Sequence, residues 1–302
     1  MRFLIAGASG FLGSHLRDSL VGAGHDVTTL VRRAPAPGAD EAHWDPYTGT
    51  LDPAVVETAD VVVNLAGAPT LGNPHSRRWA EDLERSRVTT TRVLADAIAA
   101  SSRRPAFLAG NGISYYGDHG SELVTEEADS LGDAFLTQVT RAWQDATEPA
   151  TEAGARVCIL RTAPVMDRGN APLKQQLLLF RAGLGGRIGS GGQYLPMISL
   201  RDWVGAVSFV ATHDDITGPV NVCCPQTPTN AEFTAQLARL VHRPAFLTAP
   251  AAIVRPAAGR MAPELLGSVR AVPRKLVDAG FRFADTTVAE VLASALDRSG
   301  GR

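Results

Sequence analysis

The sequence predicts a doubly wound α/β protein, in which helices cover both faces of a parallel sheet. Apolar runs that suit buried strands alternate with helical stretches through the first half of the chain. A glycine-rich loop joins the first strand to the first helix, and two helix-capping signals follow in the last third of the chain. The chain has 302 residues, enough for two domains of roughly 150 residues each. We therefore expect a large parallel-sheet domain and a smaller C-terminal α/β domain.

Short apolar runs predict the strands of the sheet. They are rich in Val, Ile, Leu and Thr and are bounded by glycine or polar residues, as buried parallel strands are. The runs occupy residues 2–6, 26–32, 61–66, 106–109 and 156–161. Because parallel neighbours need crossover connections, the segments between these runs should be mainly helical.

Helical periodicity is found between the apolar runs. The first helix carries Leu12, Leu16 and Leu20 four residues apart, which places them on one buried face. Longer helical stretches cover 77–100 and 133–153. The alternation of strand and helix predicts that the strands form one parallel sheet.

The alternation stops after the strand that ends at Arg161. Residues 183–192 contain six glycines in ten positions, which predicts a loop. The pattern Thr-x-x-Glu at 229–232 and again at 287–290 predicts two helix N-termini closed by capping boxes.

Domain boundaries follow from this change of pattern. We place the parallel-sheet domain at 1–162 and expect 201–223 to return to it. The C-terminal domain then consists of 163–200 and 224–302, with loops and short helices over the proline-bearing stretch 243–273.

Composition excludes several classes of partner. The net charge is −2, so no overall field attracts nucleic acid or an anionic membrane. No apolar run approaches the roughly 20 residues that a membrane span needs. The first residues do not resemble a signal peptide, so we expect a cytoplasmic protein. No His or Cys spacing suggests a metal site.

Three cysteines are too few for a disulfide framework and fit a reducing compartment. The adjacent pair Cys223 and Cys224 suits two small apolar residues at a strand end, with a redox pair as the alternative.

The glycine loop predicts a dinucleotide site. Gly7, Gly10 and Gly13 follow the first strand and open the first helix with G-x-x-G-x-x-G spacing. Gly7 permits the tight turn, Gly10 lets the backbone approach a pyrophosphate, and Gly13 lets helix and strand pack closely. The helix N-terminus offers free N–H groups to the phosphates. The alternative is a tight turn without a ligand. The other candidates for cofactor contact in this loop are Ser9, Phe11 and Leu12.

The end of the second strand indicates NADP(H) rather than NAD(H). An NAD site places an acidic residue there to accept from the ribose 2′-OH. Here Arg32 and Arg33 end the strand, and Asp40 and Glu41 come after a proline-rich turn. Two guanidinium groups suit a 2′-phosphate. The alternative is a solvated arginine pair.

At these residues the chain resembles the extended short-chain dehydrogenase/reductases, and most closely an atypical, nucleoside-diphosphate-sugar epimerase-like branch with a C-terminal domain of unknown function. The resemblance covers nearly the whole chain and implies a Rossmann domain, bound NADP(H) and a substrate cleft between the domains. Its marks are Trp44-Asp45-Pro46, Asn64-Leu65-Ala66-Gly67, Ser86-Arg87-Val88, Thr91, Tyr115-Tyr116-Gly117, Thr125-Glu126, Arg161, Gly183-Leu184-Gly185-Gly186, Gly191-x-Gln193, Pro273-x-x-Leu276 and Gly280-Phe281-x-Phe283. From these segments we take as further cofactor-binding candidates Leu65, Ala66, Gly67 and Arg161.

The resemblance also implies a Tyr-x-x-x-Lys pair, which this sequence does not contain. The tyrosine serves as acid and base, and the lysine lowers its pKa. Lysine occurs only at Lys174 and Lys275. In the helix where the pair belongs, the corresponding residues are Phe135 and Val139 or Thr137 and Arg141, depending on register. The helping serine is missing before Tyr116 as well, and further departures from the branch occur at Gln144 and Met197-Ile198-Ser199.

Three other residues are candidates for the chemistry. Tyr116 follows a strand at the carboxyl edge of the sheet and is a candidate proton donor, or it packs on the cofactor ring. Asn111 orients a carbonyl or is a turn residue. Arg87 binds a substrate anion or is an exposed helix arginine. The loop 183–192 with Gln193 is a lid or a connector.

These features favour an NADP(H)-dependent oxidoreductase or epimerase that acts on a small molecule. Two alternatives stay open: a protein that senses NADP(H) without turnover, and a non-redox isomerase or cyclase on the same fold. We expect no nucleic-acid or membrane partner and leave open a homodimer.

Overall fold

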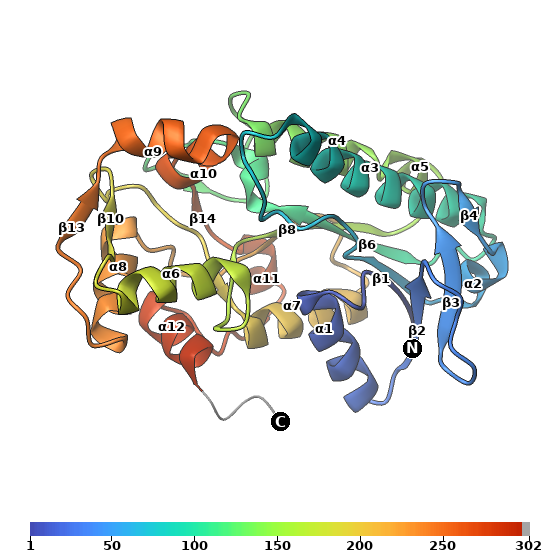
Figure 1. The fold of residues 1–302 in the computed structure, drawn as a ribbon. Helices are drawn as coiled ribbons and strands as arrows, with labels where there is room; N and C mark the ends of the chain where they lie inside the picture. Colours follow the sequence, from blue (N-terminus) through green and yellow to red (C-terminus); the bar gives the residue numbers. More distant parts are fainter. Residues whose placement is uncertain (298–302) are drawn as a thin grey trace.

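An eight-stranded sheet forms the centre of the computed structural model, which describes residues 1–297 (Figure 1). The strand order is β12-β8-β6-β5-β1-β2-β3-β4, and all neighbours are parallel except β3 and β4. This confirms the doubly wound α/β class and the Rossmann-like architecture. The bounds are β1 Arg2–Ala6, β2 Asp26–Val31, β3 Glu41–Asp45, β4 Thr50–Leu51, β5 Val61–Asn64, β6 Ala106–Gly112, β8 Val157–Thr162 and β12 Gly218–Val222.

Helices cover both faces of this sheet (Figure 1). One face carries α1 (Phe11–Gly22) and α7 (Leu200–Thr212), which pack against each other. The other face carries α2 (Pro53–Thr58), α3 (Arg77–Ala100) and α5 (Glu148–Glu152). Each face therefore has its own apolar core.

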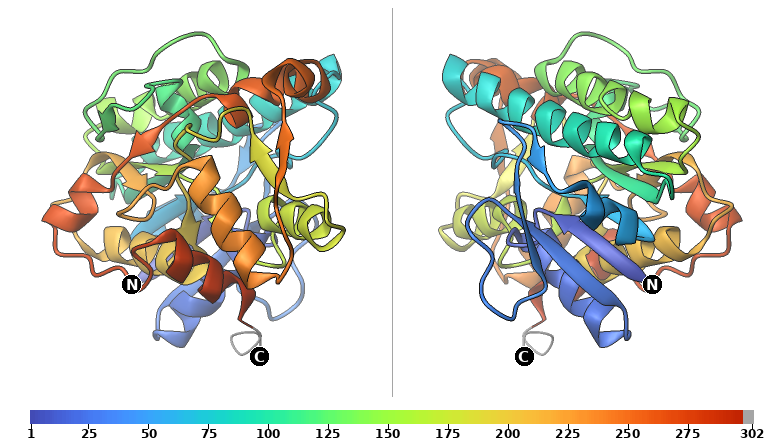
Figure 2. Two further views of the ribbon diagram at one scale, coloured as in Figure 1. Left: turned by 90° about the vertical axis from the view of Figure 1, so that its left-hand side faces the viewer. Right: turned by 90° about the vertical axis from the view of Figure 1, so that its right-hand side faces the viewer.

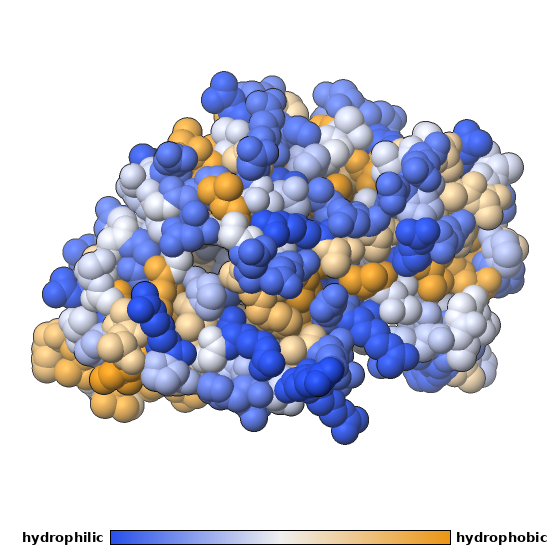
Figure 3. All heavy atoms as spheres, turned by 90° about the horizontal axis from the view of Figure 1, so that it is seen from above, coloured by the Kyte–Doolittle hydropathy of each residue, from blue (hydrophilic) through white to orange (hydrophobic). Residues whose placement is uncertain are grey.

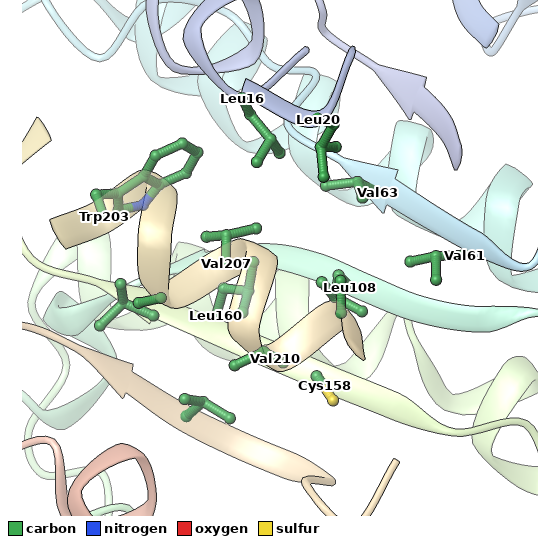
Figure 4. Close-up of a cluster of buried hydrophobic side chains, with 14 of the residues drawn as sticks. Leu16, Leu20, Val61, Val63, Leu108, Cys158, Leu160, Trp203, Val207 and Val210 are labelled. Atoms are coloured by element: carbon green, nitrogen blue, oxygen red, sulfur yellow. The ribbon is translucent and has the colours of Figure 1, made fainter. Parts of the chain in front are cut away.

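The core under α1 and α7 shows why these segments are helices. Figure 4 shows Leu16 and Leu20 of α1 and Trp203 and Val207 of α7 gathered over the sheet with Val63 of β5. All five side chains are at most 1% exposed. Because full burial of one such side chain stabilises the fold by about 1.5–3 kcal/mol, the leucine spacing on α1 is enough to fix which face of the helix meets the sheet.

The strand order changes direction at β1. The residue Ala6 lies opposite Leu30 of β2 on one side and opposite Asn64 of β5 on the other. The connections that leave β1 and β5 therefore diverge, and a crevice opens at the carboxyl ends of the strands. This crevice is where an open α/β sheet binds its ligands.

The C-terminal elements form a further apolar core beside the sheet. In the left-hand view of Figure 2, α8, α12 and β13 face the viewer. Both predicted capping boxes are present, at Thr229 with Glu232 and at Thr287 with Glu290. The helices with apolar faces in this core are α6 Ala171–Arg181, α8 Asn230–Leu240 and α12 Val288–Leu296.

Short elements lie between the central sheet and the C-terminal helices. Two-residue parallel pairs join β7 to β14 and β9 to β11, and β10 pairs with β13. Their bounds are β7 Leu123–Val124, β9 Val165–Met166, β10 Gly186–Ile188, β11 Ile198–Ser199, β13 Leu247–Ala249 and β14 Arg270–Ala271. The remaining helices are η1 Ile113–Tyr116, α4 Phe135–Asp145, α9 Ala251–Ala258, η2 Gly259–Met261, α10 Ala262–Leu266 and α11 Arg274–Asp278.

Two elements differ from the sequence-based expectation. The stretch 133–153 is divided into α4 and α5, and Pro149 lies in the first turn of α5, where its missing N–H is tolerated. The glycine-dense segment 183–192 contains the strand β10. A Cβ atom at Gly186 would lie 2.2 Å from the carbonyl oxygen of Leu247, so glycine permits the close pairing with β13.

The apolar and helical patterns in the sequence did not predict several other elements. The strands β3 and β4 and the helix α6 lie in stretches for which we predicted no regular structure. In the segment 201–223, α7 packs on α1 and β12 extends the sheet beside β8. The division into two domains at residue 162 stays a prediction.

The upper face of the molecule is mostly polar. Figure 3 shows blue side chains over much of this face, while apolar atoms gather at its left-hand end, where Figure 1 places β13. Phe246, beside that strand, is 79% exposed. Among residues 1–297, no helix is both long enough and apolar enough to cross a membrane.

Candidate functional site

A cavity of about 1810 Å³ runs from the glycine loop to the C-terminal elements. Typical small-ligand pockets occupy roughly 300–1,000 Å³, so this one has room for a dinucleotide and a second molecule. One wall is formed by the ends of β1, β5, β6 and β8, and the opposite wall by α6, β13 and the segment from α9 to α10.

The glycine loop forms the end of the cavity at α1. Gly7 has a φ of +84°, and a Cβ atom there would lie 2.5 Å from the carbonyl carbon of Leu65. A Cβ atom at Gly13 would lie 2.2 Å from the Gly7 carbonyl oxygen. These two positions therefore need glycine for the turn and for the close contact between helix and strand.

Gly10 has a different environment. A Cβ atom there would meet one neighbour within 4 Å, the Gly7 carbonyl oxygen at 3.3 Å, and the residue lines the cavity. Gly10 is the N-cap of α1 and provides no side-chain hydrogen bond to the first turn. The first-turn N–H groups, with the positive end of the helix dipole, thus remain open to an anion from the cavity. Phe11 and Leu12 also line it, whereas Ser9 is exposed outside it.

The two arginines after β2 lie at the same edge of the sheet as the glycine loop, outside the cavity wall. Arg33 donates from both terminal nitrogens to Glu41, at 2.8 and 2.6 Å. This hydrogen-bonded pair holds the pKa of the Glu41 carboxyl below its usual value. Arg32 is exposed, and its guanidinium has no hydrogen-bond or ion-pair partner among residues 1–297. Within that range, Arg32 is therefore the free cation of the pair.

Sequence reasoning missed Glu41 as a partner of Arg33. It lies after the proline-rich turn, but the parallel pairing of β3 with β2 returns it to a position opposite Thr29. A predicted strand directly after that turn, paired with β2, would have placed Glu41 near Arg33.

Arg87 is a cation in the cavity wall without an acidic partner. Its Nη1 donates to the carbonyl oxygens of Ala68 and Leu83 at 3.1 Å, and its Nη2 donates to Thr70 Oγ1 at 2.9 Å. Burial lowers the pKa of Arg87 to about 10. No carboxylate within residues 1–297 forms an ion pair with it. A half-buried cation without a counter-ion costs free energy, so an anionic ligand would be favoured here.

The segment after β5 lies against Arg87. Leu65 and Gly67 line the cavity, and a Cβ atom at Gly67 would lie 3.4 Å from Cγ of Arg87. Ala66 is not in the wall, and its N–H donates to Asn64 Oδ1 at 3.0 Å. Asn64 is thereby the residue that shapes this loop.

Asn111 lines the cavity at the end of β6, but its polar atoms have protein partners. Its Nδ2 donates to the Thr140 carbonyl oxygen at 3.0 Å, and its Oδ1 accepts from the Gly112 N–H at 2.7 Å. Asn111 lies inside β6, opposite Arg161 of β8, so it is not a turn residue, and its side chain joins the strand end to α4. The amide group is satisfied without a substrate.

Tyr116 does not face the cavity. Its side chain is completely buried, and its hydroxyl donates to Asn221 Oδ1 at 2.7 Å. The same hydroxyl oxygen accepts from Arg161 Nη1 at 2.8 Å. Burial raises the pKa of Tyr116 to about 12. We therefore revise the expectation that Tyr116 donates a proton to substrate, because its donor and acceptor positions are already used inside the protein.

Arg161, expected at the cofactor, belongs to the same buried cluster. It is 2% exposed, its Nη2 donates to Gln144 Oε1 at 2.9 Å, and its guanidinium lies 3.6 Å from the centre of the Tyr115 ring. It is not part of the cavity wall. These contacts indicate a structural role that joins β8 to η1 and α4.

The helix α4 presents small and apolar side chains where the resemblance implies Tyr and Lys. Thr137, Val139 and Thr140 line the cavity, and Thr137 donates to the Ser114 carbonyl oxygen at 2.9 Å. Neither lysine reaches it: Lys174 is exposed, and Lys275 Nζ donates to the Thr217 carbonyl oxygen at 2.7 Å. The cavity wall within residues 1–297 holds no lysine.

A pair that sequence reasoning missed brings the two parts of the chain together. Ser114 Oγ, in η1 after β6, donates to Glu264 Oε2, in α10, at 2.6 Å. Both residues line the cavity. Burial raises the pKa of Glu264. No motif connects two residues that are 150 positions apart, so only the fold could have revealed this pair.

The raised pKa of Glu264 predicts a pH-dependent stability. A carboxyl whose pKa is higher in the folded than in the unfolded state contributes stability below the unfolded pKa, and this contribution is lost as pH rises through the folded pKa. We expect Glu264→Gln to raise the melting temperature relative to the parent protein more at pH 8 than at pH 5. Glu81→Gln, at an exposed carboxylate on α3, is the control. Equal effects of Glu264→Gln at both pH values in thermal unfolding would contradict the prediction.

No group of three or more His, Cys, Asp or Glu side chains within residues 1–297 is arranged to hold a metal ion. The loop over 183–192 is anchored next to the cavity, since Gln193 Nε2 donates to the carbonyl oxygens of Ile188 and Leu265, both at 3.1 Å.

Comparison with known proteins agrees with this geometry. Residues 3–223 match the NAD dependent epimerase/dehydratase family. The chain belongs to this family. Residues 249–295, which include Glu264, match DUF1731, a domain of unknown function.

Relatives cover nearly the whole length of the chain. An epimerase family protein of Mycobacterium bovis is 42% identical over 301 residues, which is 98% of each chain. The mouse epimerase family protein SDR39U1 is 34% identical over 290 residues, which is 94% of this chain and 96% of the mouse protein. A crystal structure of human SDR39U1 with NADPH superposes with a TM-score of 0.86, at 29% identity, over 98% of this chain and 99% of the human chain.

Proposed function

We propose that this protein binds NADP(H) in its cavity and acts as an oxidoreductase on the carbonyl or alcohol group of a small molecule. The observation that carries the proposal is the glycine loop, whose one open glycine, Gly10, faces a cavity large enough for a dinucleotide and a substrate. The human relative with 29% identity was crystallised with NADPH, which supports the same cofactor here.

The residues in and beside the cavity fit this cofactor. The free N–H groups at the start of α1 would hold the pyrophosphate. Arg32 is free to bind a 2′-phosphate, and Arg87 is a second cation for an anionic group. The cofactor would supply a hydride acceptor or donor next to the substrate carbon.

The selectivity for NADPH should depend on Arg32. We expect Arg32→Ala to weaken NADPH binding at least about tenfold and to leave NADH binding unchanged, since a charge-assisted hydrogen bond contributes about 1.5–3 kcal/mol. Adding Arg33→Ala to this variant should cause a smaller further loss of NADPH affinity, because Arg33 is already paired with Glu41. Calorimetric titration measures both affinities.

The control for this prediction is Arg17→Ala, which removes an exposed arginine of α1 that pairs with Asp18. It should change neither affinity. Equal affinities of the parent protein for NADPH and NADH would contradict the assignment of the 2′-phosphate site.

A role as an NADP(H) sensor without turnover is the second candidate. The observation in its favour is the α4 wall, where Thr137, Val139 and Thr140 carry neither the phenol nor the ammonium group of the related enzymes. Measuring NADPH oxidation with carbonyl compounds and NADP⁺ reduction with alcohols separates the two functions. Tight NADPH binding without turnover in either direction would favour the sensor.

A further inference from the structure

We propose that Glu264 is the proton donor and acceptor of this cavity and that its substrate is an apolar aldehyde or ketone, with Ser114 as the residue that positions Glu264. The proposal rests on the oxidoreductase function proposed above. It places the proton-transferring group on the C-terminal domain rather than on α4.

The position of the pair supports this role. Ser114 follows β6, at the carboxyl edge of the sheet where this architecture binds its ligands, and Thr137 fixes the Ser114 backbone to α4. Glu264 approaches the same point from the opposite wall. The two walls of the cavity therefore meet at a hydrogen bond between a hydroxyl and a carboxyl group, 2.6 Å long.

One oxygen of Glu264 is engaged and the other is available. Ser114 donates to Oε2, while Oε1 has no hydrogen-bond partner among residues 1–297. A carboxyl group held in this way can carry its proton on Oε1, directed to a ligand, while Ser114 stabilises the carboxylate that forms when the proton leaves.

The charged side chains near Glu264 do not form an ion pair with its carboxyl group in the described part of the chain. The segments packed around α10 bring Asp118, Arg255 and Arg260 to this side of the molecule. Asp118 Oδ1 accepts from the N–H groups of Gly120 and Ser268, and Arg260 Nη1 donates to the Pro74 carbonyl oxygen. None of the three forms an ion pair with Glu264 in the described part of the chain. Burial therefore raises the pKa of Glu264 without an opposing cation.

The wall around Glu264 indicates an apolar substrate. The cavity beyond α4 is lined by large apolar side chains from five elements or their flanks, and Arg255 is the cation that this wall contributes within residues 1–297. A sugar linked to a nucleoside diphosphate would need several cations or open N–H groups around its phosphates. Representative apolar side chains of this wall are Leu179, Phe180, Met197, Phe233, Met261 and Leu266.

The proton balance of the reaction is simple. When a substrate carbonyl carbon takes up a hydride, for which a reduced nicotinamide is the donor, the C=O π electrons move to the oxygen. Glu264 gives its proton to that oxygen. The products are an alcohol, the oxidised nicotinamide and the Glu264 carboxylate, which regains a proton from water.

The first experiment reads the protonation of Glu264 without any substrate. Infrared difference spectra between the parent protein and Glu264→Gln, recorded from pH 4 to pH 10, should show a protonated-carboxyl band that titrates above the usual range for glutamate. Ser114→Ala should move this titration to higher pH, because the hydrogen bond that favours the carboxylate is lost. A Glu264 that titrates like exposed Glu81, compared through Glu81→Gln, would overturn the proposal.

The second experiment measures NADPH oxidation with medium-chain aldehydes and methyl ketones, and with UDP-glucose as a polar comparison. Glu264→Gln should lower kcat by about 10²–10⁴-fold while the NADPH affinity is unchanged. The pH dependence of kcat should have the midpoint of the infrared titration, and it should shift in Ser114→Ala. Glu81→Gln should leave all of these values unchanged.

The two experiments separate this inference from the proposed function. If NADPH binds and apolar carbonyls are reduced equally well by Glu264→Gln, the inference alone fails. If UDP-glucose is the substrate that is turned over, the assignment of the substrate class fails. Absence of NADPH binding to the parent protein would overturn the proposed function, and both would then fall.

Discussion

Replacing Gly10 with valine should abolish NADPH binding without unfolding the protein. Gly10 is the N-cap of α1 and lines the cavity, and a Cβ atom there would have a single neighbour, the Gly7 carbonyl oxygen at 3.3 Å. The valine side chain would therefore occupy the space in front of the first-turn N–H groups, where a pyrophosphate has to approach. We expect the affinity to fall by at least about 100-fold, because a helix terminus blocked in this way loses several charge-assisted hydrogen bonds.

The same helix provides a matched control. Gly22 lies at the other end of α1, and a Cβ atom there would have no neighbour within 4 Å, so Gly22→Val adds the same side chain away from the cavity. Calorimetric titration should show unchanged NADPH affinity for Gly22→Val, and thermal unfolding should show both variants within a few degrees of the parent protein. Full-strength NADPH binding by a folded Gly10→Val would contradict the assignment of the glycine loop.

Local patterns were sufficient to predict the centre of the fold. The leucines of α1, the apolar runs of β1 and β5 and the two capping boxes each depend on residues a few positions apart, and all are present in the structure. The glycine loop is similar, because the three glycines lie within seven residues and each has a separate steric reason. Such features can be recognised from sequence because neighbours along the chain determine them.

The contacts that give the candidate site its chemistry are of another kind. Glu41 reaches Arg33 because β3 pairs with β2, and Ser114 meets Glu264 because α10 lies beside η1 at the end of β6. No spacing rule links these residues. Tyr116 shows the converse: its position after β6 suggested a proton donor, but the packing of the side chain against Arg161 and Asn221 turns it into the protein interior.

The buried cluster around Arg161 and Tyr116 is expected to contribute strongly to the stability of the fold. Replacing Arg161 with methionine should destabilise the fold strongly while NADPH affinity is retained. Arg161 donates to Tyr116, to Gln144 and to the Glu126 carbonyl oxygen, and it stacks on Tyr115. Methionine keeps much of the volume but leaves these buried acceptors without a donor. Leaving a buried acceptor without its donor costs about 1–3 kcal/mol, and the loss of three such donors lowers the melting temperature by on the order of 10 °C.

The matched control is Arg85→Met, since Arg85 also stacks on a tyrosine, Tyr47, at 5.1 Å, but at the surface. Its effect should stay within about 0.5 kcal/mol, as is usual for exposed substitutions. Urea unfolding of both variants gives the free energies, and calorimetry at a temperature where both are folded gives the NADPH affinity. A stable Arg161→Met protein that has lost NADPH binding would return Arg161 to the cofactor site. Loss of stability with binding retained would establish that this arginine, despite its place at the end of β8, acts by holding η1 and α4 against the sheet.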